Sequence, residues 1–194
     1  MWLGSSVGPS AVDVLSLPKR LTPIFNTRAQ LIEMKIAIGS DEKTILTDFV
    51  LEELRKRGYA VNVFGPMAGE QMGWPDIGEK VGLEVSFGSA DQGIVFCWTG
   101  TGVTIAANKV PGVRAALCWD AETAKGARLW DDANVLAMSL RSTSPAVAKE
   151  ILDAWFSNAP ITYGVDGAQI ARAMELDEKY RSTETLSKAR IKEP

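Results

Sequence analysis

The segment QGIVFCWTGTGVTIAAN, residues 92–108, has the pattern of a buried strand, a glycine-rich turn and a helix in direct succession. Gly93–Phe96 is a short apolar run, which is typical of a strand that is covered on both faces. The turn follows at residues 99–102, and a helix pattern begins directly after it. In a parallel sheet this order gathers backbone N–H groups at the carboxyl edge of the strands, backed by the positive end of the helix dipole. We therefore expect the turn to bind an anion.

Cys97 ends the strand pattern and would lie on the rim where open α/β sheets bind ligands. A nearby helix N-terminus stabilises a thiolate, which makes Cys97 a candidate for chemistry. Its position is equally compatible with a buried apolar residue. A dinucleotide site is disfavoured, because the GxGxxG spacing that Gly100 and Gly102 begin would need a third glycine where Ile105 stands.

Strand and helix patterns alternate along the rest of the chain. This alternation predicts an α/β fold of three layers, Rossmann-like, with a five-stranded parallel sheet covered by helices on both faces. The other strands are expected at residues 35–39, 60–64, 113–118 and 135–139, and helices at 45–57, 74–87, 120–130 and 145–156. A further polar helix is expected over residues 165–180.

Composition limits the classes of function. The 194 residues are 46% hydrophobic, which is enough for one well-buried core, and a net charge of −3 gives no electrostatic reason to expect nucleic acid or a membrane surface as a partner. Two cysteines make no disulfide framework, so a cytoplasmic location is expected. The chain has no histidine at all. Any acid–base chemistry therefore depends on cysteine, carboxylates, lysine, hydroxyls or the backbone.

The segment CWTGTGVTIAANKVPGVRAALCWD, Cys97–Asp120, resembles the signature of a known enzyme family. The family comprises ribose-5-phosphate isomerase B and galactose-6-phosphate isomerase, and its usual form is C-G-T-G-x-G-x-x-I-A-A-N-K-x-x-G-I-R-A. The likeness extends from Met34 to Phe156. It implies an aldose–ketose isomerase that acts on a sugar or sugar phosphate through a cis-enediolate, without cofactor or metal, as a homodimer or homotetramer. The resemblance also divides the chain into an N-terminal extension (1–33), the isomerase-like domain (34–160) and a C-terminal helical tail (161–194), whose helix would serve dimerisation.

The resemblance assigns roles to residues of this chain. Cys97 matches the catalytic base of one subgroup, and Asp41 matches an acidic residue that binds substrate hydroxyls. Arg141 matches an arginine that can face the phosphate. The anion hole corresponds to Thr99 and to the backbone N–H groups around Gly100, Thr101 and Gly102.

The chain also departs from the family pattern. Glu42 stands at a histidine position after the first strand, and Trp130 stands where the family has the ring-opening histidine, at the start of the motif that ends at Asn134. A late phosphate-binding motif, Gly-Arg-His-x-x-Arg, corresponds to residues 167–172, where Arg172 remains and the other arginine and the histidine are absent. Trp98 replaces a small glycine, and Trp74 stands near the substrate where a tyrosine is usual. With the histidines gone, Glu42 or Asp131 is expected to supply the acid function.

Two alternatives stay open from the sequence. The first is a non-catalytic protein that binds a sugar or sugar phosphate on the same scaffold, which the missing histidines and arginine suggest. The second is a thiol-reactive or redox role for Cys97 with Cys118, since both end strands that we expect to be neighbours.

Overall fold

The computed structural model describes residues 33–181, and these residues form a five-stranded parallel sheet with helices on both faces. The strand order is β2-β1-β3-β5-β4. The strands are β1 (Lys35–Ser40), β2 (Ala60–Phe64), β3 (Gln92–Cys97), β4 (Ala115–Leu117) and β5 (Val135–Ser139). The predicted parallel sheet is thereby confirmed.

Six α-helices and one short 3₁₀ helix are described in residues 33–181. They are α1 (Ile45–Lys56), η1 (Gly65–Ala68), α2 (Trp74–Ser86), α3 (Thr101–Ala107), α4 (Ala121–Asp131), α5 (Pro145–Phe156) and α6 (Gly164–Tyr180). Three of the helices have a side-chain N-cap. The hydroxyls of Thr44 and Ser144 and the carboxylate of Asp120 each accept a hydrogen bond from a backbone N–H in the first turn of the helix that follows. Every strand except β2 is followed by an α-helix within a few residues, as parallel pairing requires.

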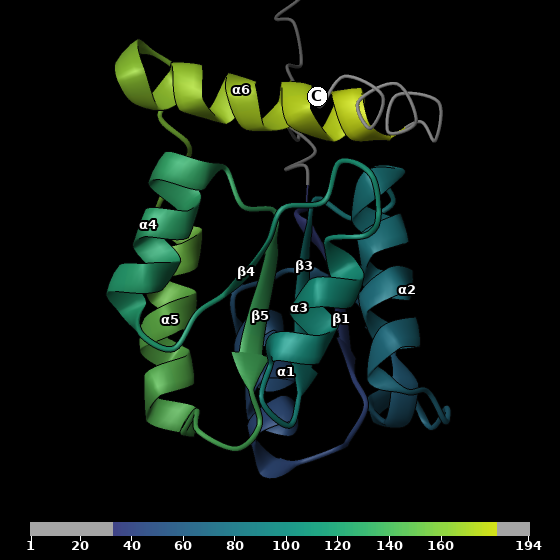
Figure 1. The fold of residues 1–194 in the computed structure, drawn as a ribbon. Coiled ribbons are helices and arrows are strands. Elements are labelled where there is room, and N and C mark those ends of the chain that lie inside the picture. The colour runs from purple at the N-terminus through teal and green to yellow at the C-terminus, as the bar shows by residue number, and fades with distance from the viewer. Residues whose placement is uncertain (1–32, 182–194) are drawn as a thin grey trace, which may run out of the picture. The chain divides into compact units, whose positions relative to one another are not determined.

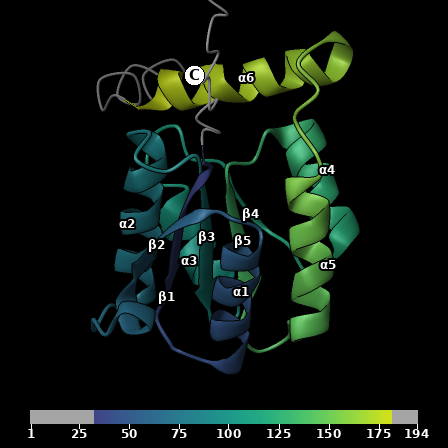
Figure 2. The same ribbon diagram turned by 180° about the vertical axis from the view of Figure 1, so that it is seen from behind.

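Helices α2 and α3 cover one face of the sheet, and α1 and α5 cover the other (Figures 1 and 2). Helix α4 packs against α5, while α6 lies across the end of the sheet where the strands begin (Figure 1). The amide of Gly112, which lies shortly before β4, donates to the Asp177 carboxylate of α6 at 2.9 Å. All strands therefore end at the edge opposite α6.

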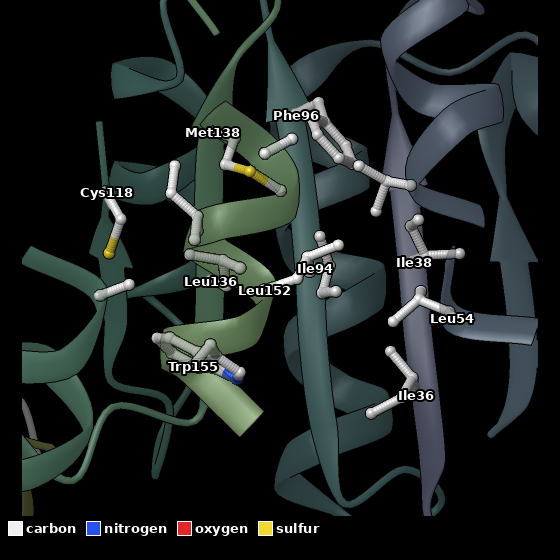
Figure 3. Packing of buried hydrophobic residues seen from close by; sticks show 14 of the residues in the cluster. Ile36, Ile38, Leu54, Ile94, Phe96, Cys118, Leu136, Met138, Leu152 and Trp155 are labelled. Atoms are coloured by element: carbon white, nitrogen blue, oxygen red, sulfur yellow. The ribbon is translucent and has the colours of Figure 1, made fainter. Parts of the chain in front are cut away.

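Each face of the sheet has its own hydrophobic core. Ile38, Phe96 and Met138 point to the face that holds Trp155 of α5, as Figure 3 shows. The alternate residues along the same strands face α2 and α3; they include Ala37, Val95, Cys97 and Ala137. The central strands read as continuous apolar runs because both of their faces are buried.

Strand β4 is shorter than the predicted 113–118. It forms one edge of the sheet, and the side chain of Asn108 takes the place of a further strand there. The Asn108 amide donates to the Ala115 carbonyl at 2.8 Å and accepts from the Ala115 N–H at 2.8 Å. Residues 112–114 do not extend this strand, and their N–H groups bond elsewhere. The Gly112 N–H donates to Asp177 of α6, and the Arg114 N–H donates to the side chain of Asn134, which precedes β5.

None of the helices within residues 33–181 combines the length and apolar character that a transmembrane segment needs. The expected N-terminal extension lies almost entirely outside the described residues.

Candidate active site

The carboxyl ends of β1, β3 and β5 converge on the turn that follows Cys97. Gly100 adopts a left-handed conformation there, with φ = 77°, and its N–H donates to the Cys97 carbonyl at 3.1 Å. A Cβ atom at this position would lie 2.5 Å from Leu117 Cδ1 and 3.1 Å from the Met138 backbone. Only glycine permits both the positive φ and this close approach. The turn is therefore fixed by its neighbours on β4 and β5.

Hydrogen bonds join this turn to the loop after β5. The Cys97 carbonyl accepts from the Leu140 N–H at 3.0 Å, and the Trp98 carbonyl accepts from the Arg141 N–H at 3.0 Å. Cys97 itself pairs in register with Ser139, the last residue of β5. Its side chain is buried, whereas those of Trp98 and Arg141 are exposed. The rim thus combines a buried thiol, an exposed indole and an exposed guanidinium.

Ser139 and Ser40 help to hold this rim, although the sequence interpretation gave them no role. The Ser139 hydroxyl donates to the Trp98 carbonyl at 2.9 Å and accepts from the Ser142 N–H at 3.2 Å. The Ser40 hydroxyl accepts from the Glu42 N–H at 3.2 Å. Both are buried polar residues that end an apolar strand. A single serine closing such a run is the signal that would have identified them.

Two further side chains lie at the glycine-rich turn. The hydroxyls of Thr99 and Thr101 are 2.6 Å apart and share a hydrogen bond. Trp74, at the start of α2, packs its indole beside Gly102, where an added Cβ would lie 3.1 Å from the ring. Thr101, Gly102 and Val103 are the first three residues of α3, whose N–H groups cannot bond within the helix. The turn therefore offers hydroxyl and N–H donors together.

Asp41 and Glu42 follow β1 on the other side of Cys97. Ser40 pairs in register with Phe96, so the next residue, Asp41, is level with Cys97. Burial raises the pKa of the Asp41 carboxyl; its own backbone N–H acts in the opposite direction, and the nearby Glu42 carboxylate adds to the rise. Glu42 is exposed.

The structure thus brings ten of the predicted site residues to one edge. We call them the carboxyl-edge group: Asp41, Glu42, Trp74, Cys97, Trp98, Thr99, Gly100, Thr101, Gly102 and Arg141.

The other four predicted residues lie at the opposite edge of the same chain. We call Trp130, Asp131, Asn134 and Arg172 the amino-edge group. Asn134 precedes β5, whereas Cys97 pairs with Ser139 at its end. At ~3.3 Å per residue, the distance along the chain from Asn134 to Ser139 separates the two groups by roughly 17 Å. A single chain does not bring them to one site.

The amino-edge group has contacts of its own. The Trp130 ring packs against Gly126, where an added Cβ would lie 2.9 Å from the ring. Trp130 is 54% exposed. Trp130 and Asp131 line a groove with Gln169 of α6, and burial raises the pKa of the Asp131 carboxyl. Arg172 is exposed and pairs with Glu175 at 2.9 Å.

Asn134 has a structural role. Its side-chain oxygen accepts from the Arg114 N–H at 2.8 Å, and its amide donates to the Gly112 carbonyl at 2.9 Å. Arg114 in turn pairs with the Asp132 carboxylate at 2.7 Å. Both ends of the Asn134 amide therefore hold the loop before β4, and the predicted contact with substrate would have to compete with these bonds.

The expected proximity of Cys97 and Cys118 is wrong. Strand β5 lies between β3 and β4, and the two side chains belong to the cores on opposite faces of the sheet. Cys118 lies to the left of Met138 in Figure 3. Both cysteines are buried, and their thiols are free. Burial raises the pKa of the Cys118 thiol to about 12, with the Asp120 and Asp131 carboxylates adding to the effect. The structure gives no support to a disulfide or a paired redox role.

Within residues 33–181, no group of three or more cysteine, aspartate or glutamate side chains is arranged to hold a metal ion. The chemistry that this edge can perform is proton transfer by a thiol and a carboxyl beside hydrogen-bond donors for a developing anion.

Known proteins are similar to this chain in sequence and in fold. A family described as Ribose/Galactose Isomerase matches residues 36–173. Ribose-5-P isomerase B of Listeria innocua is 36% identical over 149 residues, which cover 76% of this chain and all of that protein. D-erythrulose-4-phosphate isomerase of Pectobacterium atrosepticum is 37% identical over 124 residues, or 63% of this chain and 82% of that one.

A solved structure of a similar protein has the same fold. Ribose-5-phosphate isomerase B of Clostridium thermocellum superimposes with a TM-score of 0.70 at 41% identity, covering 76% of this chain and 99% of that protein. The sheet and its covering helices are therefore common to both proteins.

Proposed function

Because the chain belongs to the ribose/galactose isomerase family, we propose that it is an aldose–ketose isomerase acting on a sugar phosphate, with Cys97 as the base. The observation that carries the proposal is the position of Cys97. It ends the central strand directly before the left-handed Gly100 turn and is level with Asp41 on the neighbouring strand.

The proposed reaction is a proton transfer between adjacent carbons. The Cys97 thiolate removes the proton from C2 of the open-chain aldose, and the electrons of that bond form the C1–C2 double bond of a cis-enediolate. Negative charge then develops on the oxygen of C1. The hydroxyl of Thr99 and the N–H groups of Thr101 and Gly102 donate to this oxygen, which lowers the barrier most when water is excluded. The proton of the C2 hydroxyl passes to the oxygen of C1, so the negative charge then lies on the oxygen of C2. The Cys97 thiol returns its proton to C1, the C1–C2 double bond becomes a single bond, and C2 becomes the ketone carbonyl.

The exposed aromatic and charged groups of the rim suit a polyol phosphate. Trp98 presents a flat apolar surface for a sugar face, and Arg141 offers a guanidinium to a phosphate. Asp41 can accept from sugar hydroxyls. In the predicted arrangement, Arg172 and Asp131 of a second subunit complete the site, because one chain holds them at its other edge.

Proton exchange tests this function directly. Ribose 5-phosphate, ribulose 5-phosphate, the corresponding tetrose phosphates and the free sugars are incubated in deuterated water and followed by NMR. We expect exchange at C2 of an aldose and C1 of a ketose, lowered at least ~100-fold in Cys97→Ser. Full exchange in that variant would remove Cys97 as the base.

The absence of histidine supports a second candidate, a sugar-phosphate binding protein without catalysis. Calorimetry would then show saturable binding of a sugar phosphate, while the same NMR panel shows no exchange above the level without protein. Any exchange that depends on Cys97 excludes this candidate.

A further inference from the structure

Before an aldose can be enolised, its ring must open, and that step needs a second proton-transfer group. An aldopentose 5-phosphate exists mainly as a furanose, in which C1 is bonded to the ring oxygen O4. Opening breaks the C1–O4 bond and places a proton on O4. The chain has no histidine to supply that proton near neutral pH. The inference concerns this step and rests on the proposed isomerase function.

Asp41 has the right position for the task. Register places it beside Cys97, and adjacent strands are about 4.8 Å apart. A sugar held with C2 at the thiol would therefore have its C1 and O4 within reach of the Asp41 carboxyl.

The surroundings of Asp41 favour the protonated carboxyl. Its Oδ1 is buried and has no hydrogen-bond partner among the described residues. An ionised carboxylate with one oxygen buried and unpaired is costly, and a proton on the group reduces that cost. The adjacent Glu42 carboxylate acts in the same direction, as does burial, and both raise the Asp41 pKa.

The carboxylates of Glu42 and Asp131 are less suitable than Asp41 as the acid for ring opening. Glu42 is exposed at the rim, where it affects Asp41 through its charge. Asp131 belongs to the amino-edge group, so only the Asp131 of a second subunit can approach Cys97.

We propose that Asp41 is the general acid that opens the sugar ring. Its carboxyl gives a proton to O4 as the C1–O4 bond breaks and the bonding electrons pass to O4. The hydroxyl on C1 loses its proton to water and becomes the aldehyde carbonyl. The hydroxonium ion formed returns a proton to the Asp41 carboxylate, so the cycle closes without any other reagent.

The test compares a substrate that must open with one that is already open. Ribose 5-phosphate is a furanose, whereas ribulose 5-phosphate cannot close a furanose because its O5 carries the phosphate. Asp41→Asn keeps the shape of the side chain but has no acidic proton. We expect ribose 5-phosphate conversion to fall ~100-fold, and Cys97-dependent C1 exchange in ribulose 5-phosphate to fall less than ~10-fold.

A second readout separates ring opening from weaker binding. With increasing Asp41→Asn protein, the rate of ribose 5-phosphate consumption should reach a ceiling set by spontaneous ring opening. Wild type should show no such ceiling over the same range. Asp48→Asn is the matched control, because Asp48 is an exposed carboxylate in the first turn of α1, outside both site groups. It should retain both activities.

Five outcomes would overturn the inference. Equal loss of both reactions in Asp41→Asn would make Asp41 a general binding residue, and equal retention would give it no role. Selective loss of ribose 5-phosphate conversion in Glu42→Gln or Asp131→Asn, with Asp41→Asn unaffected, would assign the acid elsewhere. A wild type that acts only on tetrose phosphates, which cannot form this ring, would remove the step while leaving the isomerase. No Cys97-dependent exchange with any substrate would remove the proposed function itself.

Discussion

Cys118 shows how strongly a single residue's surroundings decide its chemistry. Its thiol is enclosed in the core beneath α4 and α5, near two carboxylates, and its pKa is raised from 9.0 to about 12. The unfolded chain therefore loses the thiol proton first as the pH rises. Above about pH 9, the unfolded state is stabilised by ionisation while the native state keeps its proton.

This difference predicts an alkaline loss of stability. Between pH 9 and 11, the free energy of unfolding of the wild type should fall more steeply than that of Cys118→Ala, by up to about 1.4 kcal/mol per pH unit. Urea unfolding at a series of pH values measures both slopes. The lysines and tyrosines titrate equally in both proteins, so they cancel in the comparison. Parallel curves would show that the Cys118 thiol ionises as readily in the native state as in the unfolded chain.

Among the elements, β4 depends most on a side chain outside the sheet. It has three residues, pairs with β5 on one side, and on the other is satisfied at Ala115 by Asn108. Asn108→Ala leaves the Ala115 N–H and carbonyl without these bonds. We expect a loss of about 1–3 kcal/mol in the free energy of unfolding and faster hydrogen exchange at the Ala115 amide.

Asn62→Ala is the control for this change. Asn62 is an exposed asparagine of β2, the strand at the other edge. If both variants lose the same stability and Ala115 exchanges at its wild-type rate in each, Asn108 does not support the edge of the sheet.

The same elements show what could be predicted from the sequence. Strands β1, β3 and β5 are buried on both faces, so they appear as apolar runs, and residues that directly follow them fall on one edge by necessity. Cys97, Asp41 and Arg141 could therefore be placed. The order of parallel strands has no comparable local signal, because a crossover connection can return on either side of a strand. For this reason the sequence did not predict that β5 lies between β3 and β4, and the expected proximity of Cys97 and Cys118 was wrong.

In the molecule as a whole, the predicted site residues are divided between the carboxyl edge and the amino edge of the sheet. Helix α4 runs back from the carboxyl edge and ends with Trp130 and Asp131, and α6 crosses the amino edge with Arg172 (Figure 1). Residues assigned by resemblance to one site thus lie at opposite ends of each chain. They can act together only if the carboxyl edge of one subunit meets the amino edge of another.

Complementation between inactive variants tests this arrangement. Cys97→Ser lacks the proposed base at the carboxyl edge, and Arg172→Ala lacks the predicted phosphate contact at the amino edge. Each alone should be poorly active. In a mixture dissociated and reassembled in equal amounts, half of two-fold dimers contain one chain of each kind, and half of their sites carry neither change. Activity should therefore recover to about a quarter of the wild-type value. No recovery in mixed dimers confirmed by mass spectrometry would place the whole site within one chain, and a 21.0 kDa species in sedimentation at micromolar, fully active concentration would do the same.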